Sequence, residues 1–258
     1  MEIIRSSQNA LYKHLHKLAE SRRERLKSAE TLLIGLHLIE SAQQASWPLV
    51  RLLVREGSEG DAAISAIIRQ RVAPLTLLDP ALFDSIEQIA TSTGIMALVA
   101  IPATPGPVHE GCCLLLEGVQ DPGNVGTILR TAAAAGVAQV WLTPGCADIW
   151  SPKVVRAGMG AHFLLPIIER IDAATALTAF KGQLATTTLD ATQSLYDSDL
   201  RGNIVLALGS EGAGISPELL ERASLRLRIP MATAVESLNV SAAAAVCLFE
   251  RLRQTLHG

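Results

Sequence analysis

The stretch IPMATAVESLNVSAAAAV, residues 229–246, joins a predicted buried strand to an alanine-rich helix. At the join lies the polar cluster Glu236-Ser237-Leu238-Asn239, in apolar surroundings and without a phosphate-binding glycine loop. Either Ser237 or Asn239 can cap the helix, which explains one of the polar residues. Capping does not explain the whole cluster, so this stretch alone supports a capping role and a ligand-binding role about equally.

The composition is that of a folded globular protein, since 49% of the 258 residues are hydrophobic and 18% are charged. Aromatic residues make up only 3%, which argues against base-stacking platforms for single strands. The net charge of −3 argues against a uniformly basic molecule. Positive charge is concentrated near the N-terminus, at Arg5, Lys13, Lys17, Arg22, Arg23, Arg25 and Lys27. Such a run usually forms a solvated helix face, and the alternative is a surface that contacts phosphates.

Cysteine usage and hydropathy indicate a cytoplasmic protein. The four cysteines, at 112, 113, 146 and 247, form no CxxC pair, and three of them lie in apolar runs. We therefore expect reduced thiols, with neither a disulfide nor a metal site. The segment MEIIRSSQNALYKHL lacks the apolar core of a signal peptide, and no apolar run reaches the ~18 residues of a membrane span. We expect no membrane partner.

A proline- and glycine-rich linker at residues 104–110 divides the chain into domains of residues 1–103 and 111–258. In the first domain, short apolar runs alternate with helical patterns and predict a small α/β fold, which opens with one long basic helix from Asn9 to about Lys27. The second domain has near-continuous Val, Ile and Leu strands, which predict a parallel sheet covered on both faces. These strands are residues 112–118, 138–143, 184–189, 203–209 and 225–231, and predicted helices span 124–135 and 240–256 or begin at Ser151-Pro152 and Ser216-Pro217.

Ligands bind at the carboxyl ends of the strands in such a sheet, and two further strand ends are unusual. After residue 118, Asn124 is a predicted helix N-cap, and Arg130 on the second turn leans back over Gly126. Its guanidinium can then reach the helix N-terminus, which favours an anion. An ordinary cap with a surface arginine is slightly favoured when this loop is taken alone.

The second strand end is LALGSEGAGIS, residues 206–216, with three glycines within six residues around Glu211. Such glycines allow the backbone to approach a flat ligand closely. Their spacing is not the dinucleotide fingerprint, and a glycine turn with a solvated Glu211 is favoured for this loop alone. On another predicted helix, Lys153 and Arg156 lie three apart and can contact phosphates, although a solvated face is favoured there too.

Taken jointly, these stretches resemble the three motifs of the SpoU (TrmH-type) RNA ribose 2′-O-methyltransferases of the SPOUT superfamily. The stretches are QDPGNVGTILRTAAAAG, with its N-x-G-x-x-x-R pattern, LALGSEGAGIS and IPMATAVESLNVSAAAAV. Their order and spacing agree over residues 112–256, and the joint signal is specific although each motif alone is not. SQNALYKHLHKL and STGIMALV resemble, more weakly, the L30e-like substrate-binding domain that is common in this family.

The resemblance implies a deep trefoil knot in the parallel sheet, which no sequence pattern predicts. It implies S-adenosylmethionine as the cofactor, a homodimer, and an RNA substrate, with 23S rRNA favoured over tRNA. By motif position, the expected cofactor-binding residues are Leu208, Gly209, Gly214, Ile229, Met231 and Leu238. The expected catalytic residues are Arg130, Asn124, Glu211, Ser237 and Asn239. The expected RNA-binding residues are Lys13, Lys17, Arg22, Arg23, Lys153 and Arg156.

The implied reaction is attack of a ribose 2′-OH on a sulfonium methyl group, for which the hydroxyl must lose its proton. Arginine holds its proton firmly and is a poor general base. We therefore expect Arg130 to clamp the adjacent phosphate and stabilise the forming alkoxide, while a phosphate oxygen or a transiently neutral guanidinium takes the proton. Asn124, Ser237 and Asn239 are expected to orient the ribose and Arg130, and Glu211 to hold its loop or pair with Arg130.

The chain departs from the family pattern at Ala134, where Asp is usual, at Ile34, where Glu is common, and at Thr93, where Gln is usual. The last two weaken any transfer of RNA specificity. Four alternatives stay open: a tRNA 2′-O-methyltransferase, a knotted base methyltransferase, a non-catalytic RNA-binding factor and a nucleotide-dependent oxidoreductase. The N-x-G-x-x-x-R pattern disfavours a base methyltransferase. The intact Arg130, Glu211 and Asn239 disfavour a non-catalytic factor, and the missing G-x-G-x-x-G disfavours an oxidoreductase.

Overall fold

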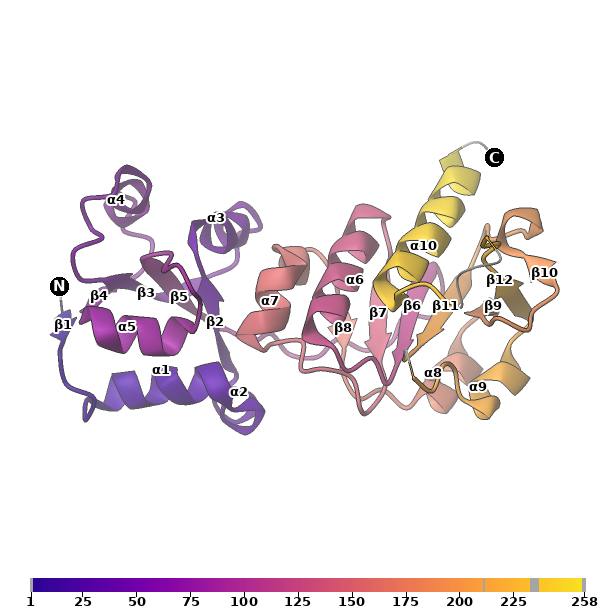
Figure 1. The fold of residues 1–258 in the computed structure, drawn as a ribbon, viewed down its shortest axis with the longest axis horizontal. Helices are drawn as coiled ribbons and strands as arrows, with labels where there is room; N and C mark the ends of the chain where they lie inside the picture. Colours follow the sequence, from indigo (N-terminus) through magenta and orange to yellow (C-terminus); the bar gives the residue numbers. More distant parts are fainter. Residues whose placement is uncertain (1, 211, 233–236, 257–258) are drawn as a thin grey trace. The chain divides into compact units, whose positions relative to one another are not determined.

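The computed structural model describes residues 2–210, 212–232 and 237–256 (Figure 1). They form two compact units, Met1–Ala103 with Trp150–Phe163, and Thr104–Ile149 with Leu164–Gly258. Each unit has its own sheet and its own hydrophobic core. Among the described residues, none of the helices has the length and apolar character that a membrane span requires.

The first unit is built on a five-stranded mixed sheet with the strand order β1-β4-β3-β5-β2. Its strands are β1 Glu2–Ile4, β2 Glu30–Ile34, β3 Leu49–Arg55, β4 Leu75–Leu78 and β5 Ile95–Ala100. β1, β4 and β3 run parallel, whereas β5 pairs antiparallel with both β3 and β2. The α/β character expected for this half of the chain is therefore present, with one antiparallel strand between two others.

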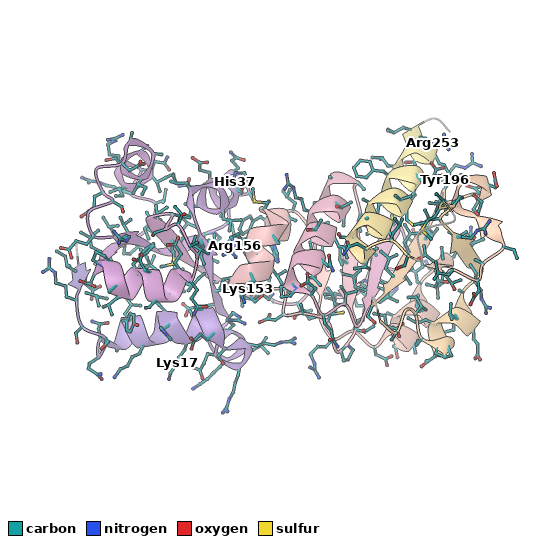
Figure 2. The ribbon with its side chains drawn as sticks, in the orientation of Figure 1. Lys17, His37, Lys153, Arg156, Tyr196 and Arg253 are labelled. Carbon is teal, nitrogen blue, oxygen red and sulfur yellow. The ribbon has the colours of Figure 1, made fainter. Side chains whose placement is uncertain are left out.

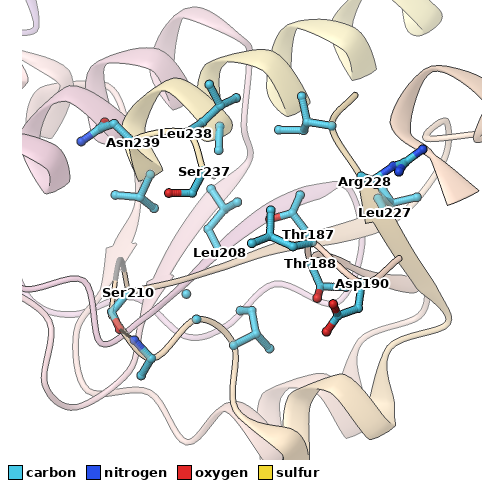
Figure 3. A pocket seen from close by; sticks show the side chains of 18 of the residues that line it. Thr187, Thr188, Asp190, Leu208, Ser210, Leu227, Arg228, Ser237, Leu238 and Asn239 are labelled. Carbon is cyan, nitrogen blue, oxygen red and sulfur yellow. Dashed lines mark hydrogen bonds between the residues drawn. The ribbon is translucent and has the colours of Figure 1, made fainter. Parts of the chain in front are cut away.

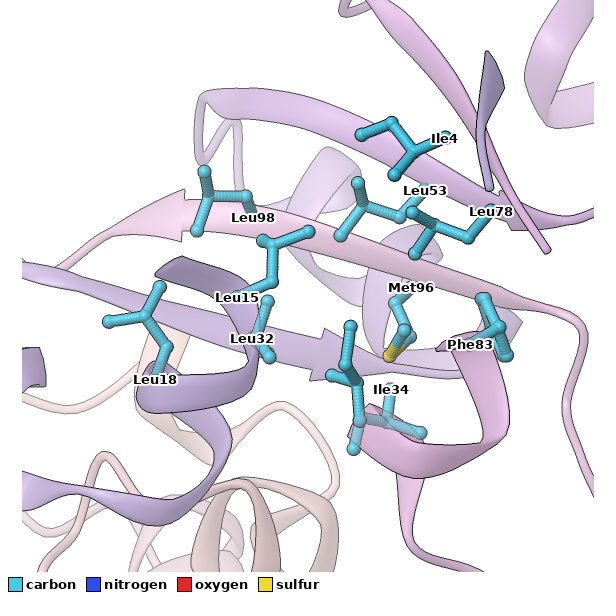
Figure 4. Close-up of a cluster of buried hydrophobic side chains, with 11 residues drawn as sticks. Ile4, Leu15, Leu18, Leu32, Ile34, Leu53, Leu78, Phe83, Met96 and Leu98 are labelled. Carbon is cyan, nitrogen blue, oxygen red and sulfur yellow. The ribbon is translucent and has the colours of Figure 1, made fainter. Parts of the chain in front are cut away.

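Helices cover both faces of this sheet. α1 (Ala10–Glu20) and α5 (Pro80–Glu87) lie on one face, and α3 (Leu36–Gln44) and α4 (Ala62–Arg69) on the other. Because successive side chains of a strand alternate between the faces, Leu32 and Ile34 of β2 point together toward α1 and α5. There they join a buried cluster with Leu15 and Phe83 (Figure 4).

The prediction of a single long basic helix from Asn9 to about Lys27 is wrong, because the helix is interrupted at Ser21. α1 ends at Glu20, and α2 spans Arg22–Ser28. Ser21 has an extended backbone, and its hydroxyl accepts a hydrogen bond from the Glu24 N–H, which caps α2. Arg25 of the basic run is buried and donates to the Leu18 carbonyl, so one of the predicted surface cations instead holds the two helices together.

The second unit is built on a seven-stranded sheet with the order β10-β12-β9-β11-β6-β7-β8. Its strands are β6 Cys112–Glu117, β7 Gln139–Leu142, β8 Ile167–Ile168, β9 Gln183–Thr187, β10 Gln193–Ser194, β11 Ile204–Gly209 and β12 Leu225–Arg228. Every neighbouring pair is parallel, as the near-continuous apolar strands predicted. Consequently the carboxyl ends of these strands all meet at one edge of the sheet.

The helices of the second unit are α6 Pro122–Ala134, α8 Ala173–Ala179, α9 Pro217–Arg222 and α10 Val240–Leu256. α6 and α10 pack together on one face, and α8 and α9 lie on the other (Figure 1). On the second face, Cys113 and Leu115 of β6 and Val205 of β11 pack with Phe180, whose ring meets Trp141 edge to face at 5.9 Å between centroids. α9 is capped by Ser216 with Pro217 at its first position, as predicted.

The segment 150–163, which the sequence places in the second domain, packs with residues 1–103. It contains α7 (Pro152–Gly158), which Ser151 caps as predicted. The Thr31 hydroxyl of β2, fully buried, donates to the Trp150 carbonyl at 2.6 Å. The Trp47 ring lies 6.4 Å from the Trp150 ring and 5.2 Å from Phe163. One buried hydrogen bond and an aromatic cluster therefore attach this segment to the first unit.

We expect Thr31→Val to destabilise the protein by about 1–3 kcal/mol, because the variant keeps the shape of the side chain but removes the buried hydrogen bond from the Thr31 hydroxyl to the Trp150 carbonyl. Urea unfolding measures the change. Thr255→Val is the control, since the exposed Thr255 hydroxyl bonds a carbonyl of its own helix and its loss should cost less than about 0.5 kcal/mol. Equal stability of the two variants would contradict the importance of this bond.

Candidate active site

A cavity of about 520 Å³ opens at the carboxyl edge of the parallel sheet (Figure 3). Its walls come from the ends of β9, β11 and β12, from the glycine-rich loop after β11, and from the first residues of α10. This volume lies within the range of small-molecule and cofactor pockets. All the residues predicted to bind the cofactor line it, namely Leu208, Gly209, Gly214, Ile229, Met231 and Leu238.

The glycine-rich loop folds tightly back onto the end of β11. The Gly214 N–H donates to the Ser210 carbonyl at 2.9 Å, and Gly214 has a φ of +66°, a conformation that favours glycine. A Cβ on Gly209 would lie 2.0 Å from the carbonyl carbon and oxygen of Gly214. We predicted that these glycines let a ligand approach the backbone closely. In the structure the returning loop itself lies against Gly209, and the shape of the loop therefore requires a glycine there.

Glu117, which the sequence analysis missed, anchors the far end of this loop. It is the last residue of β6, and its Oε2 accepts a hydrogen bond from the Ser216 N–H at 2.7 Å. Ser216 caps α9, so this carboxylate joins the end of β6 to the start of α9. A charged residue that ends an otherwise apolar strand was the available signal, but its partner lies 99 residues away.

Asn124 does not cap α6, contrary to the prediction. Asp121 is the N-cap, with Pro122 at the first position of the helix, and its Oδ1 accepts from the Asn124 N–H at 2.7 Å. The Asn124 side-chain oxygen instead accepts from Asn239 Nδ2 at 3.0 Å. The hydrogen bond brings the first turn of α6 to the first turn of α10.

Asn239 of the polar cluster has two roles, a helix cap and a side-chain partner. Its Oδ1 accepts from the Ser241 N–H at 2.9 Å and caps α10, while its Nδ2 binds Asn124. Ser237 and Asn239 both line the cavity. The hydrogen bond joins Asn124 to the Ser237–Asn239 stretch, and the catalytic role of these three residues stays a prediction. Glu211 and Glu236 lie outside the described residues.

Arg130 lies on the exposed side of α6 and does not line the cavity. It follows Asn124 by six residues, which is about 9 Å along a helix axis. Gly126, over which the side chain was expected to lean, is buried. Within the described ranges, the Arg130 guanidinium has no hydrogen bond or ion pair, so it is the one described member of the predicted catalytic group that the fold leaves outside the cluster.

Residues 111–249 match the family model of the SpoU rRNA Methylase family. The chain belongs to this family. It is 32% identical over 258 residues to the 23S rRNA (guanosine(2553)-2′-O)-methyltransferase RlmP of Bacillus subtilis. That alignment covers 96% of this chain and 98% of RlmP. The crystal structure of the SpoU methyltransferase AviRb from Streptomyces viridochromogenes with the cofactor AdoMet has a TM-score of 0.89 at 26% identity, over 97% of this chain and 100% of that one. A crystal structure of an RNA 2′-O ribose methyltransferase has a TM-score of 0.84 at 31% identity, over 98% of this chain and 99% of that one.

These SpoU structures confirm the predicted α/β fold with a parallel C-terminal sheet. The trefoil knot stays a prediction. The four cysteines are free thiols, and burial raises the pKa of Cys113 and of Cys247 to about 12. These two side chains are therefore held as neutral core groups.

The cations predicted to bind RNA all belong to the first unit of this SpoU protein. Lys13, Lys17 and Arg23 are exposed on α1 and α2, and Lys153 is exposed on α7. Lys17 and Lys153 are labelled in Figure 2. Arg156 is half-buried, and so is Arg22, which is engaged in contacts within the fold. The exposed lysines have the freedom to meet phosphates that the two half-buried arginines partly lack.

We expect Gly209→Ala to open the glycine-rich loop of this SpoU protein, because the added methyl group overlaps the Gly214 backbone. Such overpacking typically costs about 1–3 kcal/mol, so the Gly214 amide should exchange with solvent about 5- to 160-fold faster. Amide hydrogen exchange measures this. Gly212→Ala is the matched control, since a Cβ there meets nothing within 4 Å; equal protection in both variants would show that the loop does not need Gly209.

Proposed function

We propose that this chain transfers the methyl group of S-adenosylmethionine to a ribose 2′-hydroxyl of 23S rRNA. The observation that carries the proposal is the hydrogen-bonded pair Asn124–Asn239 at the rim of the strand-end cavity, in a chain of the SpoU family. Among relatives, RlmP carries the name of a 23S rRNA 2′-O-methyltransferase and AviRb was crystallised with AdoMet.

The cavity suits the cofactor because its walls combine strand-end backbone with apolar side chains. Leu208, Ile229 and Leu238 offer apolar contact to an adenosine, and Gly209 keeps the adjoining loop folded clear of the space. When bound, S-adenosylmethionine supplies a sulfonium whose methyl group is activated toward nucleophiles. The residues of the chain hold it and position the substrate hydroxyl beside it.

Positioning is the main contribution that we assign to the protein. Asn124 and Asn239 fix each other, and with Ser237 they orient the ribose; well-oriented reactants can lower a barrier by roughly 7–11 kcal/mol. Arg130 clamps the neighbouring phosphate and stabilises the forming alkoxide, and the proton passes to a phosphate oxygen or a transiently neutral guanidinium. We assign Glu211 to holding its loop or pairing with Arg130.

The first unit serves as the RNA-binding part in this proposal. Lys13, Lys17, Arg22, Arg23, Lys153 and Arg156 supply its positive charge. A second copy of the chain is proposed to pack against α10, where Phe249 and Leu256 are 48% and 70% exposed and form apolar surface that a partner can cover.

We expect Arg130→Ala to abolish methyl transfer while S-adenosylmethionine binding is retained, because Arg130 lies outside the cavity that holds the cofactor. Arg130→Lys should also be poor, since an ammonium cannot copy the bidentate fork of a guanidinium. Tritium transfer to 23S rRNA measures the rate, and calorimetry measures the cofactor. Arg201→Lys is the control, because Arg201 is exposed and pairs only with Asp199 among the described residues.

Wild-type activity in Arg130→Ala would overturn the role of that residue. Alkaline digestion of the product separates the reaction types, since 2′-O-methylation blocks cleavage at one step and base methylation does not. Preferential methylation of tRNA would change the substrate, and failure to bind S-adenosylmethionine would favour a non-catalytic RNA-binding factor. Mapping ribose methylation in a deletion strain against its parent would then locate the nucleotide.

We expect the double variant Lys13→Ala, Lys17→Ala to weaken RNA binding without loss of helix stability, because alanine is a good helix former. If both lysines contact phosphates, the slope of log K against log salt should fall by roughly 1.4, at about 0.7 for each single-strand contact. Filter binding over a salt series measures this. Lys181→Ala in the second unit is the control and should leave the slope unchanged. A similar fall in the slope for the double variant and for Lys181→Ala would contradict the assignment of α1 to the RNA-binding surface.

A further inference from the structure

The corner of the cavity at the end of β9 differs from its apolar walls. Of the described residues that line the cavity, only Asp190 and Arg228 carry a charged side chain. Arg228 is the last residue of β12, and Asp190 lies three residues beyond the end of β9, the strand with which β12 pairs in parallel through Leu227 and Thr187. They form no ion pair with each other in the described part of the chain, and in Figure 3 the Arg228 side chain extends away from Leu208 and Ser237.

Asp190 is held at this corner by a backbone turn. The Thr188 N–H donates to the Leu227 carbonyl at 3.0 Å, and the Ala191 N–H donates back to the Thr188 carbonyl at 3.4 Å. The turn places the Asp190 carboxylate in the same corner as the Thr188 hydroxyl, and both residues line the cavity. Asn239 lies on the opposite side in Figure 3, so Asp190 is remote from the end at which we place the reaction.

We propose that Asp190 binds the ribose hydroxyls of the cofactor's adenosine, with the Thr188 hydroxyl beside it. The proposal rests on the placement of S-adenosylmethionine in this cavity. A ribose presents two neighbouring hydroxyls that both donate and accept, and a carboxylate offers two acceptor oxygens while a threonine hydroxyl offers a donor and acceptors. Carboxylates near strand ends bind ribose hydroxyls in other nucleotide-binding α/β folds.

Ligands that lack one hydroxyl test the proposal directly. Calorimetry of S-adenosylhomocysteine and of its 2′-deoxy and 3′-deoxy analogues is carried out on the wild type, Asp190→Asn and the control Asp197→Asn. Asp197 is exposed and lies outside the cavity. We expect Asp190→Asn to bind S-adenosylhomocysteine about tenfold more weakly, the factor that corresponds to roughly 1.4 kcal/mol for a hydrogen bond to a charged group.

The decisive result is the comparison between ligands. The loss caused by Asp190→Asn should shrink for the analogue that lacks the hydroxyl held by Asp190, and Asp197→Asn should bind all three ligands as the wild type does. Equal losses of affinity for all three ligands would overturn the assignment. If 5′-methylthioadenosine, which lacks the amino-acid end, then binds Asp190→Asn as tightly as it binds the wild type, the carboxylate binds the cofactor's ammonium instead. Unchanged binding in Asp190→Asn would also overturn it, whereas absence of binding to the wild type would overturn the cavity as the cofactor site.

Discussion

The double engagement of the Asn239 side chain is the interaction on which the candidate reaction site depends. One amide caps α10 through its oxygen and holds Asn124 through its nitrogen, so both ends of the group are used and its orientation is fixed. The amide satisfies both partners and so joins two helix starts that lie 115 residues apart in the sequence.

Much of the second unit could be predicted because its strands are buried on both faces and are apolar along their whole length. β1, β8 and β10 were missed, since strands of two or three residues are too short to show a period. The rule that places Ser before Pro at a helix start gave α7 and α9 correctly, and the same rule applied to Asp121-Pro122 gives the observed cap of α6. The error at Asn124 came from weighing its own capping preference above that pattern.

The site could be predicted only through the joint motif. Glu117 and Ser216, or Asn124 and Asn239, meet across 99 and 115 residues, and no local periodicity contains such contacts. The need for Gly209 has the same origin, because the atoms that exclude a Cβ belong to the returning loop. The composition and spacing of the motif stretches show from the sequence that they are unusual. That these stretches meet at one edge of the sheet follows only from the strand order in the structure.

In the mechanism that we propose, the exposure of Arg130 makes the RNA part of the catalytic arrangement. Asn124, Ser237 and Asn239 are gathered by the fold before any substrate arrives, but the described part of the chain offers the guanidinium no partner. We propose that a phosphate of the correctly seated RNA supplies that partner, and that RNA-binding energy from the cations of the first unit is used to order Arg130. In that mechanism, a wrong RNA that does not place a phosphate there leaves the transition-state charge without its donor, so we expect selectivity in the rate of transfer more than in affinity.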